Sequence, residues 1–403
     1  MKTWWYKISL FFLFSVAFIG TSLRAVFLIR LPFQYSNLVH THSHIAFQGW
    51  IYTLMLLLTT SLFLKEKQIQ NGHYPLQFKL TILVIIGILI SFTLQGYGFY
   101  SILFSSLFQL LNYWFFFRFF RDIKHPDNEI KGSISILFVK TGLWLGLLST
   151  LLPWGIGILS AKGHNDSELY HSFIYAFLHF QYNGWFLFVA IGLFFKCLEK
   201  NNVFYDRKLS LKFYWLFSIA VVPALSLSFL GMSFRNIMIL PAYLAASLQI
   251  AGGVFFFLIL KATLRKLFLK KSKWFQLFLM AFLLSFFLKI VLQFLSPFPI
   301  FEPYAFHNKN IVLAYLHLSL IGVISFLLLA ILIELKWLSI NLLSRTGNTL
   351  LLIGFIISEL ILALNGIGYL SDNKILFLGS AIMTIGIFLL FLNPGKYPRG
   401  KPA

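Results

Sequence analysis

Residues 310–333, NIVLAYLHLSLIGVISFLLLAILI, form an apolar run without a single Asp, Glu, Lys or Arg. As an α-helix this run is about 36 Å long, which exceeds the ~30 Å of hydrocarbon in a bilayer. Near its start the run carries His317, a polar side chain that lipid does not solvate. The segment therefore predicts a transmembrane helix with a functional or hydrogen-bonded histidine.

The rest of the chain has the same character. It is 59% hydrophobic and only 11% charged, with a mean hydropathy of +0.82, which excludes a soluble globule with a charged surface. We predict one all-α transmembrane domain over residues 1–403, a polytopic membrane bundle of about 12 helices. The expected spans are 7–29, 42–64, 80–97, 99–119, 134–160, 170–198, 211–231, 236–260, 274–295, 310–333, 348–370 and 375–392.

The net charge of +21 is distributed as in a membrane protein and does not indicate a nucleic-acid partner. If the N-terminus lies inside, most of the 33 Lys and Arg residues fall on the same side as both termini. The positive-inside rule then predicts a multi-pass protein of the bacterial inner (plasma) membrane with both termini cytoplasmic. The lipid bilayer is the expected partner, and the basic run 261–273 is an inner loop facing anionic lipid.

A short cassette recurs three times: HIAFQGW at 44–50, HFQYNGW at 179–185 and HLSLIGV at 317–323. Each has a glycine five residues after the histidine, although glycine makes up only 26 of 403 residues. The copies fall at nearly equal intervals, on expected spans two, six and ten. We therefore predict an internal repeat of three four-helix units, about 1–119, 121–260 and 261–392, around a pseudo-threefold axis along the membrane normal.

The cassettes place polar groups on one helix face. Positions i and i+4 lie about 40° apart on a helix, so Gln48 can orient His44 and Asn183 can orient His179. The glycine removes a side chain where a flat cofactor or a neighbouring backbone comes close. The alternative is that these are packing glycines beside histidines that only hydrogen-bond across the bundle.

Two further histidines are candidate metal ligands. His42 lies two residues before His44 and points about 160° away from it on a helix, so the pair cannot share one site if both are helical. His171 lies about two turns outward of His179. A zinc cluster around His42 lacks carboxylate or thiolate partners nearby in the sequence, and Cys197, the only cysteine, excludes a covalent haem attachment motif.

With its cassette histidines on spans two, six and ten, the chain resembles the catalytic subunit of haem-copper oxidases and the related NnrS-type membrane proteins. The resemblance covers the whole chain in architecture but only these cassettes in sequence. It implies a b-type haem held by His44 and His317, with His179 at the position of a copper ligand. It also implies a redox partner of the cytochrome c or quinol type.

The chain departs from that family at two places. Span seven, LKFYWLFSIAVVPALSLSFLG at 211–231, has no histidine pair, and the position of the second haem ligand is Tyr315. Tyr315 can ligate a haem iron through its phenolate. We therefore expect no complete copper site, although His179 and His171, helped by His42, are the residues that can hold copper or another metal.

Other charged residues are weaker candidates. Arg24 and Arg235 are cations on the outer side that can pair with haem propionates. The alternative partner for each is a lipid phosphate. Lys140, Lys289 and Glu359 lie within spans, where charges can form proton relays.

These observations predict a membrane haem protein for electron transfer or the handling of a small gas, nitric oxide or oxygen. If it is an enzyme, it is a haem-dependent oxidoreductase. The second hypothesis is a secondary transporter with histidines as proton or substrate sites, and the third is a non-catalytic scaffold.

Overall fold

The computed structural model describes residues 1, 3–124, 132–370 and 372–394. Helices make up 83% of the structure, and the described residues contain no β-strand. This confirms the all-α class. Ten helices in the described part are long and apolar enough to cross a membrane, or eleven if the pair Arg207–Ala220 and Pro223–Phe229, bent by 47°, is one span. The chain is therefore a multi-pass membrane protein in contact with lipid.

The expected number of twelve spans is not confirmed. The segment expected at 99–119 forms the helix α6 (Phe99–Asp122), but this helix is not among the ten. Its serines, together with Gln109 and Asn112, lower its hydropathy.

The residues form two compact units, Met1–Glu129 with Leu328–Ala403 (unit 1) and Ile130–Leu327 (unit 2). The boundary lies inside α15 (Phe326–Glu334). The three four-helix units of the sequence stay a prediction, because a contact boundary at this place neither requires nor excludes them.

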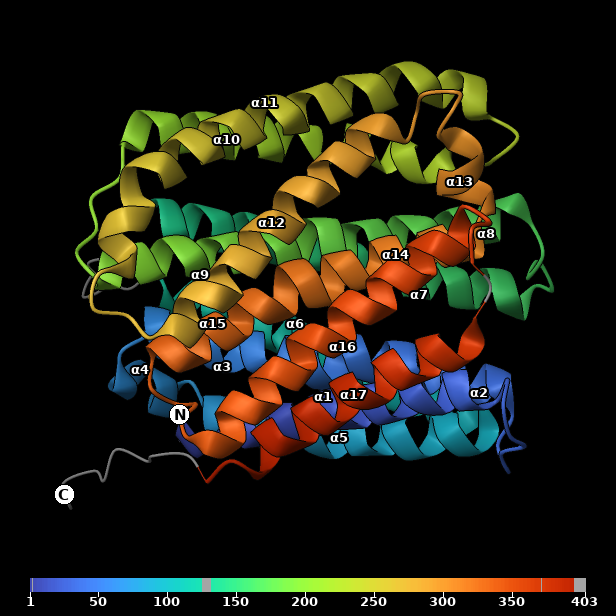
Figure 1. The fold of residues 1–403 in the computed structure, drawn as a ribbon, viewed down its shortest axis with the longest axis horizontal. Helices are drawn as coiled ribbons and strands as arrows, with labels where there is room; N and C mark the ends of the chain where they lie inside the picture. The colour runs from blue at the N-terminus through green and yellow to red at the C-terminus, as the bar shows by residue number, and fades with distance from the viewer. Residues whose placement is uncertain (2, 125–131, 371, 395–403) are drawn as a thin grey trace. The chain divides into compact units, whose positions relative to one another are not determined.

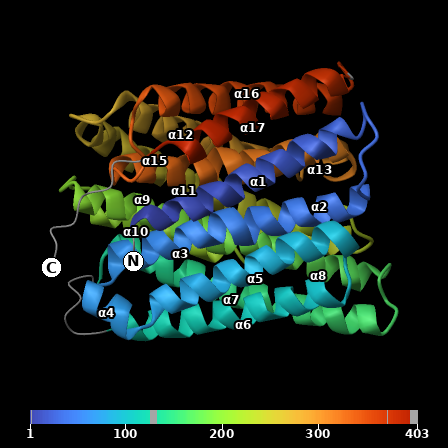
Figure 2. The same cartoon turned by 90° about the horizontal axis from the view of Figure 1, so that it is seen from below.

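Unit 1 contains the N-terminal helices and the last two helices of the chain. Figures 1 and 2 show α1 running beside α2, which packs on α5, and α16 running along α17, while α1 packs on α17. Its elements before α6 are η1 (Thr3–Trp5), α1 (Tyr6–Ala25), α2 (Tyr35–His44), η2 (Ile45–Tyr52), α3 (Thr53–Phe63), α4 (Glu66–Asn71) and α5 (Tyr74–Gln95). Its C-terminal helices, after α15, are α16 (Leu342–Gly366) and α17 (Asn373–Leu392).

A tight turn joins α5 to α6. Gly96 has φ +62°, a left-handed conformation that favours glycine, and an added Cβ would lie 2.4 Å from Asn37 Oδ1. This turn brings the chain back so that α5 and α6 pack as a hairpin.

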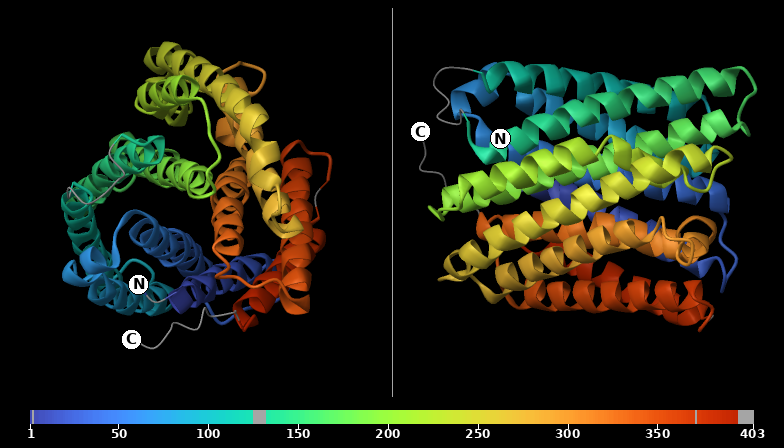
Figure 3. Two further views of the ribbon diagram at one scale, coloured as in Figure 1. Left: turned by 90° about the vertical axis from the view of Figure 1, so that its left-hand side faces the viewer. Right: turned by 90° about the horizontal axis from the view of Figure 1, so that it is seen from above.

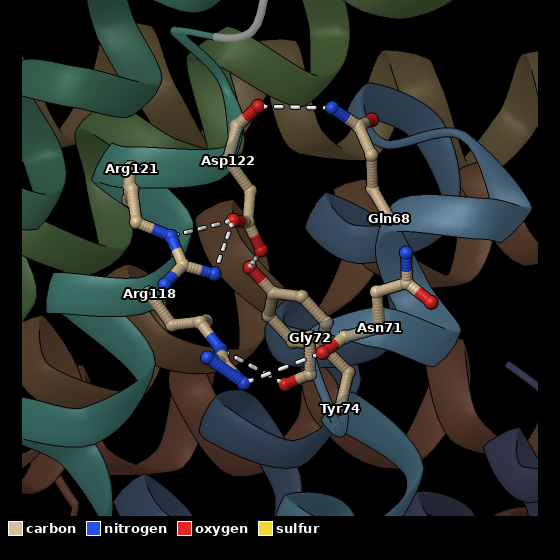
Figure 4. Close-up of polar contacts among 7 residues, drawn as sticks. All are labelled: Gln68, Asn71, Gly72, Tyr74, Arg118, Arg121 and Asp122. Atoms are coloured by element: carbon tan, nitrogen blue, oxygen red, sulfur yellow. Dashed lines mark hydrogen bonds and ion pairs between the residues drawn. The ribbon is translucent and has the colours of Figure 1, made fainter.

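At the other end of that hairpin, polar side chains fasten α4 (Figure 4). Tyr74 donates to Asp122 Oδ2 over 2.9 Å, and Arg121 donates to Asp122 Oδ1. Arg118 donates through Nε to the carbonyl of Gly72 (3.1 Å), just after the last turn of α4. A cation at this helix end satisfies carbonyl groups that have no intrahelical donor.

The first helix of unit 2 is α7, and Ser133 caps it by accepting a hydrogen bond from Ile136 N. Figure 3 shows its helices end-on, with α10 beside α11, which in turn packs on α12. Its elements are α7 (Ile134–Ala161), α8 (Glu168–Leu178), η3 (His179–Phe186), α9 (Leu187–Lys200), α10 (Arg207–Ala220), η4 (Pro223–Phe229), α11 (Arg235–Phe268), α12 (Lys273–Leu295), α13 (Glu302–His307), α14 (Lys309–His317) and η5 (Leu318–Ser325).

The connection between α9 and α10 is tied to Glu199. Tyr205 donates to Glu199 Oε1 over 2.9 Å, and Ser135 donates to Glu199 Oε2 over 2.7 Å. Burial, and then the Glu199 carboxylate, raise the pKa of Tyr205. Tyr205 is therefore a neutral hydrogen-bond donor at neutral pH.

Candidate functional site

The three cassettes share a local backbone structure as well as a sequence pattern. Each contains a π-helical segment of eight residues: η2 follows His44, η3 begins at His179 and η5 follows His317. π-Helical hydrogen bonding is rare, and short stretches of it inside α-helices are frequent at functional sites. The recurring sequence pattern thus marks a recurring backbone irregularity.

His44 is partly buried among aromatic rings of unit 1. Its imidazole stacks on Phe92 of α5, with ring centroids 4.2 Å apart and planes inclined by 22°. Its Nε2 lies 3.4 Å from the hydroxyl oxygen of Tyr97, and Gln48 one turn further on also interacts with the ring. The Tyr97 contact is at the long limit of a hydrogen bond. The imidazole is therefore well oriented, while Nε2 is only weakly engaged.

His42 faces α1 and not α5. Its Nδ1 lies 3.0 Å from the carbonyl oxygen of Val16, and the absence of a side chain on Gly20 makes room for its ring. This confirms that His42 and His44 point to different sides of the helix. His42 is not part of the aromatic environment of His44.

His179 is completely buried in unit 2, and both of its nitrogens have protein partners. Nε2 donates to the carbonyl oxygen of Val221 over 2.8 Å, and Nδ1 accepts from Asn183 Nδ2 over 3.3 Å. The prediction that Asn183 orients His179 is confirmed. His171, in contrast, is exposed on α8.

The Val221 carbonyl is available because the helix breaks there. Pro223 has no N–H to donate, and Leu225 N bonds to the carbonyl of Val222 rather than to that of Val221. His179 therefore supplies the donor that a continuous helix would have supplied. Metal binding by His179 would require Nε2 to leave this carbonyl.

Metal-ligand side chains do not gather in the described residues. No group of three or more His, Cys, Asp or Glu side chains in that part of the chain lies close enough together to hold a metal ion. The copper assignment of His179, His171 and His42 stays a prediction without a geometric counterpart.

Polar side chains gather near the second and third cassettes in unit 2, where η3 and η5 are in contact. The ammonium of Lys289 lies 5.7 Å from the centre of the Tyr315 ring. Asn183 interacts with the hydroxyls of both Tyr182 and Tyr315. We use the name polar core for His179, Tyr182, Asn183, Gln249, Lys289, Gln293 and Tyr315.

Sequence reasoning missed Gln249 and Gln293 and gave Lys289 little weight. The available signal was spacing: Lys289 and Gln293 are four residues apart on one apolar span, so they lie on one helix face. Gln249 is a lone amide in the apolar stretch 236–260, which by itself does not distinguish a site from a packing contact.

Both candidate arginines have acidic neighbours. Arg24 interacts with Tyr35 and with the Glu359 carboxylate of α16 within unit 1. Arg235 forms an ion pair with Glu302 at the start of α13 within unit 2. A haem propionate would therefore have to share these cations with protein carboxylates.

The cassette glycines serve close helix packing. An added Cβ on Gly49 would lie 3.0 Å from Phe12 of α1, and one on Gly184 would lie 3.1 Å from Leu145 of α7. At these two positions it is a neighbouring side chain, and not space for a flat cofactor, that fills the gap. Neither the comparison with protein-family models nor that with curated proteins finds a match for this chain.

Proposed function

We propose that this chain is a membrane-embedded haem protein that works in electron transfer or in handling nitric oxide or oxygen. His44 and His317 are the residues that would hold the haem. The observation that carries the proposal is the coincidence of all three histidine cassettes with π-helical segments. Twelve spans, cytoplasmic termini in a bacterial inner membrane, and a cytochrome c-type or quinol partner belong to the same proposal.

The surroundings of His44 fit an axial ligand. Phe92 and Gln48 fix the orientation of the ring, while the contact of Nε2 with Tyr97 is at the long limit of a hydrogen bond. A neutral imidazole that is held by its surroundings with one nitrogen weakly engaged is what a haem ligand requires. His179 does not fit, because both of its nitrogens are used.

A bound haem would supply one-electron redox chemistry. The chain's own contribution is different. The buried ring of Phe92 covers one face of the His44 imidazole, and the apolar third cassette around His317 keeps the local dielectric constant low. Both effects stabilise a neutral imidazole as the ligand.

The test is the absorption spectrum of the purified protein, oxidised and dithionite-reduced. We expect a sharp reduced alpha band that is lost in both His44→Ala and His317→Ala. The control is His171→Ala, which changes an exposed histidine and should keep the spectrum. Full six-coordinate haem in both ligand variants, or no haem in the wild-type protein after haem-supplemented expression, would overturn the proposal.

Proton- or ion-coupled transport is the second candidate. It is favoured by Lys289, a lysine that is only 3% exposed within a helix apolar enough to span the membrane. Intramembrane charges commonly mark ion and substrate paths. In proteoliposomes, proton flux that follows an imposed gradient and is abolished by Lys289→Met would support transport. Flux equal to that of empty liposomes would exclude it.

A further inference from the structure

Lys289 is an interior cation without an acidic partner. Its ammonium donates to Gln293 Oε1 over 2.8 Å and lies over the Tyr315 ring. Among the described residues no carboxylate lies within ion-pair distance of it. An ammonium has three N–H donors, and burying a charge with unsatisfied donors is unfavourable, because the protein does not replace the hydrogen bonds to water.

The same part of unit 2 contains buried acceptors without donors. Gln249 Oε1 and Asn183 Oδ1 have no hydrogen-bond partner in the structure, and their residues are only 7% and 6% exposed. A buried oxygen that remains without a donor destabilises the fold, because it has lost its hydrogen bonds to water. The two amide oxygens lack hydrogen-bond donors, and the Lys289 ammonium lacks further acceptors among the described residues. One molecule that both donates and accepts hydrogen bonds can therefore satisfy all three groups.

These groups line one small cavity. Its volume is about 10 Å³, and its walls combine the polar groups of Asn183, Gln249, Lys289 and Gln293 with the rings of Phe188, Phe217 and Phe286. A cavity of this volume is at the lower limit for holding one water molecule. The two oxygens without hydrogen-bond partners disfavour an anion in this cavity, because they need donors.

We propose that this cavity is a binding site for one structural water molecule. The water accepts a hydrogen bond from Lys289 Nζ and donates its two hydrogens to Gln249 Oε1 and Asn183 Oδ1. A single water matches this set because it offers two donors together with lone pairs.

The water connects Lys289 to the second cassette. Asn183 already donates to His179 and interacts with Tyr315, so the hydrated lysine joins them in one hydrogen-bonded group. Four elements, η3, α11, α12 and α14, contribute to it. The site does not depend on haem, so it stands or falls separately from the proposed function.

Hydroxyl-radical footprinting by X-ray radiolysis of the purified full-length protein tests the proposal, because radicals form from bound water and label adjacent rings. We expect oxidation of Phe217 and Phe286, which line the cavity and are 4% and 0% exposed. The controls are Phe138 and Phe195, equally buried in unit 2 but away from the cavity. Labelling of the cavity rings several-fold above the controls supports the site.

A variant sharpens the test. Gln249→Leu removes one acceptor and fills the cavity, so the labelling of Phe217 and Phe286 should fall to the level of Phe138 and Phe195. Background labelling of all four rings in the wild-type protein would overturn the proposal without any variant. A high-resolution density map that shows the cavity empty would overturn it too.

Discussion

The first and second cassettes share their histidine, glycine and tryptophan and the same π-helical backbone, yet their histidines have different surroundings. His44 lies between aromatic rings with Nε2 at 3.4 Å from a hydroxyl, whereas His179 is 1% exposed with hydrogen bonds at both nitrogens. The difference comes from the neighbouring helix. α5 offers His44 a phenylalanine ring, while the broken α10 offers His179 a free carbonyl. A repeated motif therefore fixes where an imidazole lies, but its neighbours decide whether that imidazole is free to bind a ligand.

The largest expected difference between the two histidines is in haem binding. His44→Gln should abolish the low-spin spectrum, because the axial imidazole is lost, whereas His179→Gln should keep it, because Gln can still donate to the Val221 carbonyl. Reduced-minus-oxidised spectra at equal protein concentration measure both. If the two variants lose haem to the same extent, the proposed division of roles is wrong.

Stability should show the opposite order. His179→Leu leaves the Val221 carbonyl unsatisfied inside the bundle and should lower the free energy of unfolding by about 2–4 kcal/mol. His44→Leu loses mainly a ring contact with Phe92 and should cost no more than about 1 kcal/mol in the haem-free protein. Thermal unfolding of haem-free protein in detergent compares them, and equal losses would contradict the structure.

Substitution of the cassette glycine should lower the stability of the protein by a similar amount in the first and the second cassette. Gly49→Ala and Gly184→Ala each place a methyl group within about 3 Å of a neighbouring helix side chain and should each cost about 1–2 kcal/mol. Gly157→Ala is the matched control, because an added Cβ there meets nothing within 4 Å. If the melting temperature falls in only one of the variants Gly49→Ala and Gly184→Ala, the two glycines have different functions.

Much of the architecture could be predicted from the sequence, because helix length and apolar composition follow directly from the residues. The spans around 310–333 and 170–198 appear as helices of nearly the predicted extent. The span at 211–231 differs: a proline, lacking an N–H, breaks it into α10 and η4. The sequence contained that proline, but apolarity alone does not show where a helix bends.

The candidate site was predictable only in part. The i+4 spacing correctly placed Asn183 beside His179, and the i+2 spacing correctly separated His42 from His44. Helical spacing does not identify the side chain on the facing helix. For this reason the Val221 carbonyl and the amide of Gln249 could not be assigned to the environment of His179 and Lys289.

The sequence by itself thus determined an all-helical membrane protein with three histidine cassettes at nearly equal intervals along the chain, because these properties depend on composition and local spacing. Only the tertiary structure decided that His44 meets Phe92, that His179 completes the hydrogen bonding of a broken helix, and that Lys289 shares a cavity with two unsatisfied amides. These contacts join residues between 40 and more than 100 positions apart in the chain, and they depend on which helices pack together. Packing of that kind is selected by the fit of whole helix surfaces, which no local pattern records.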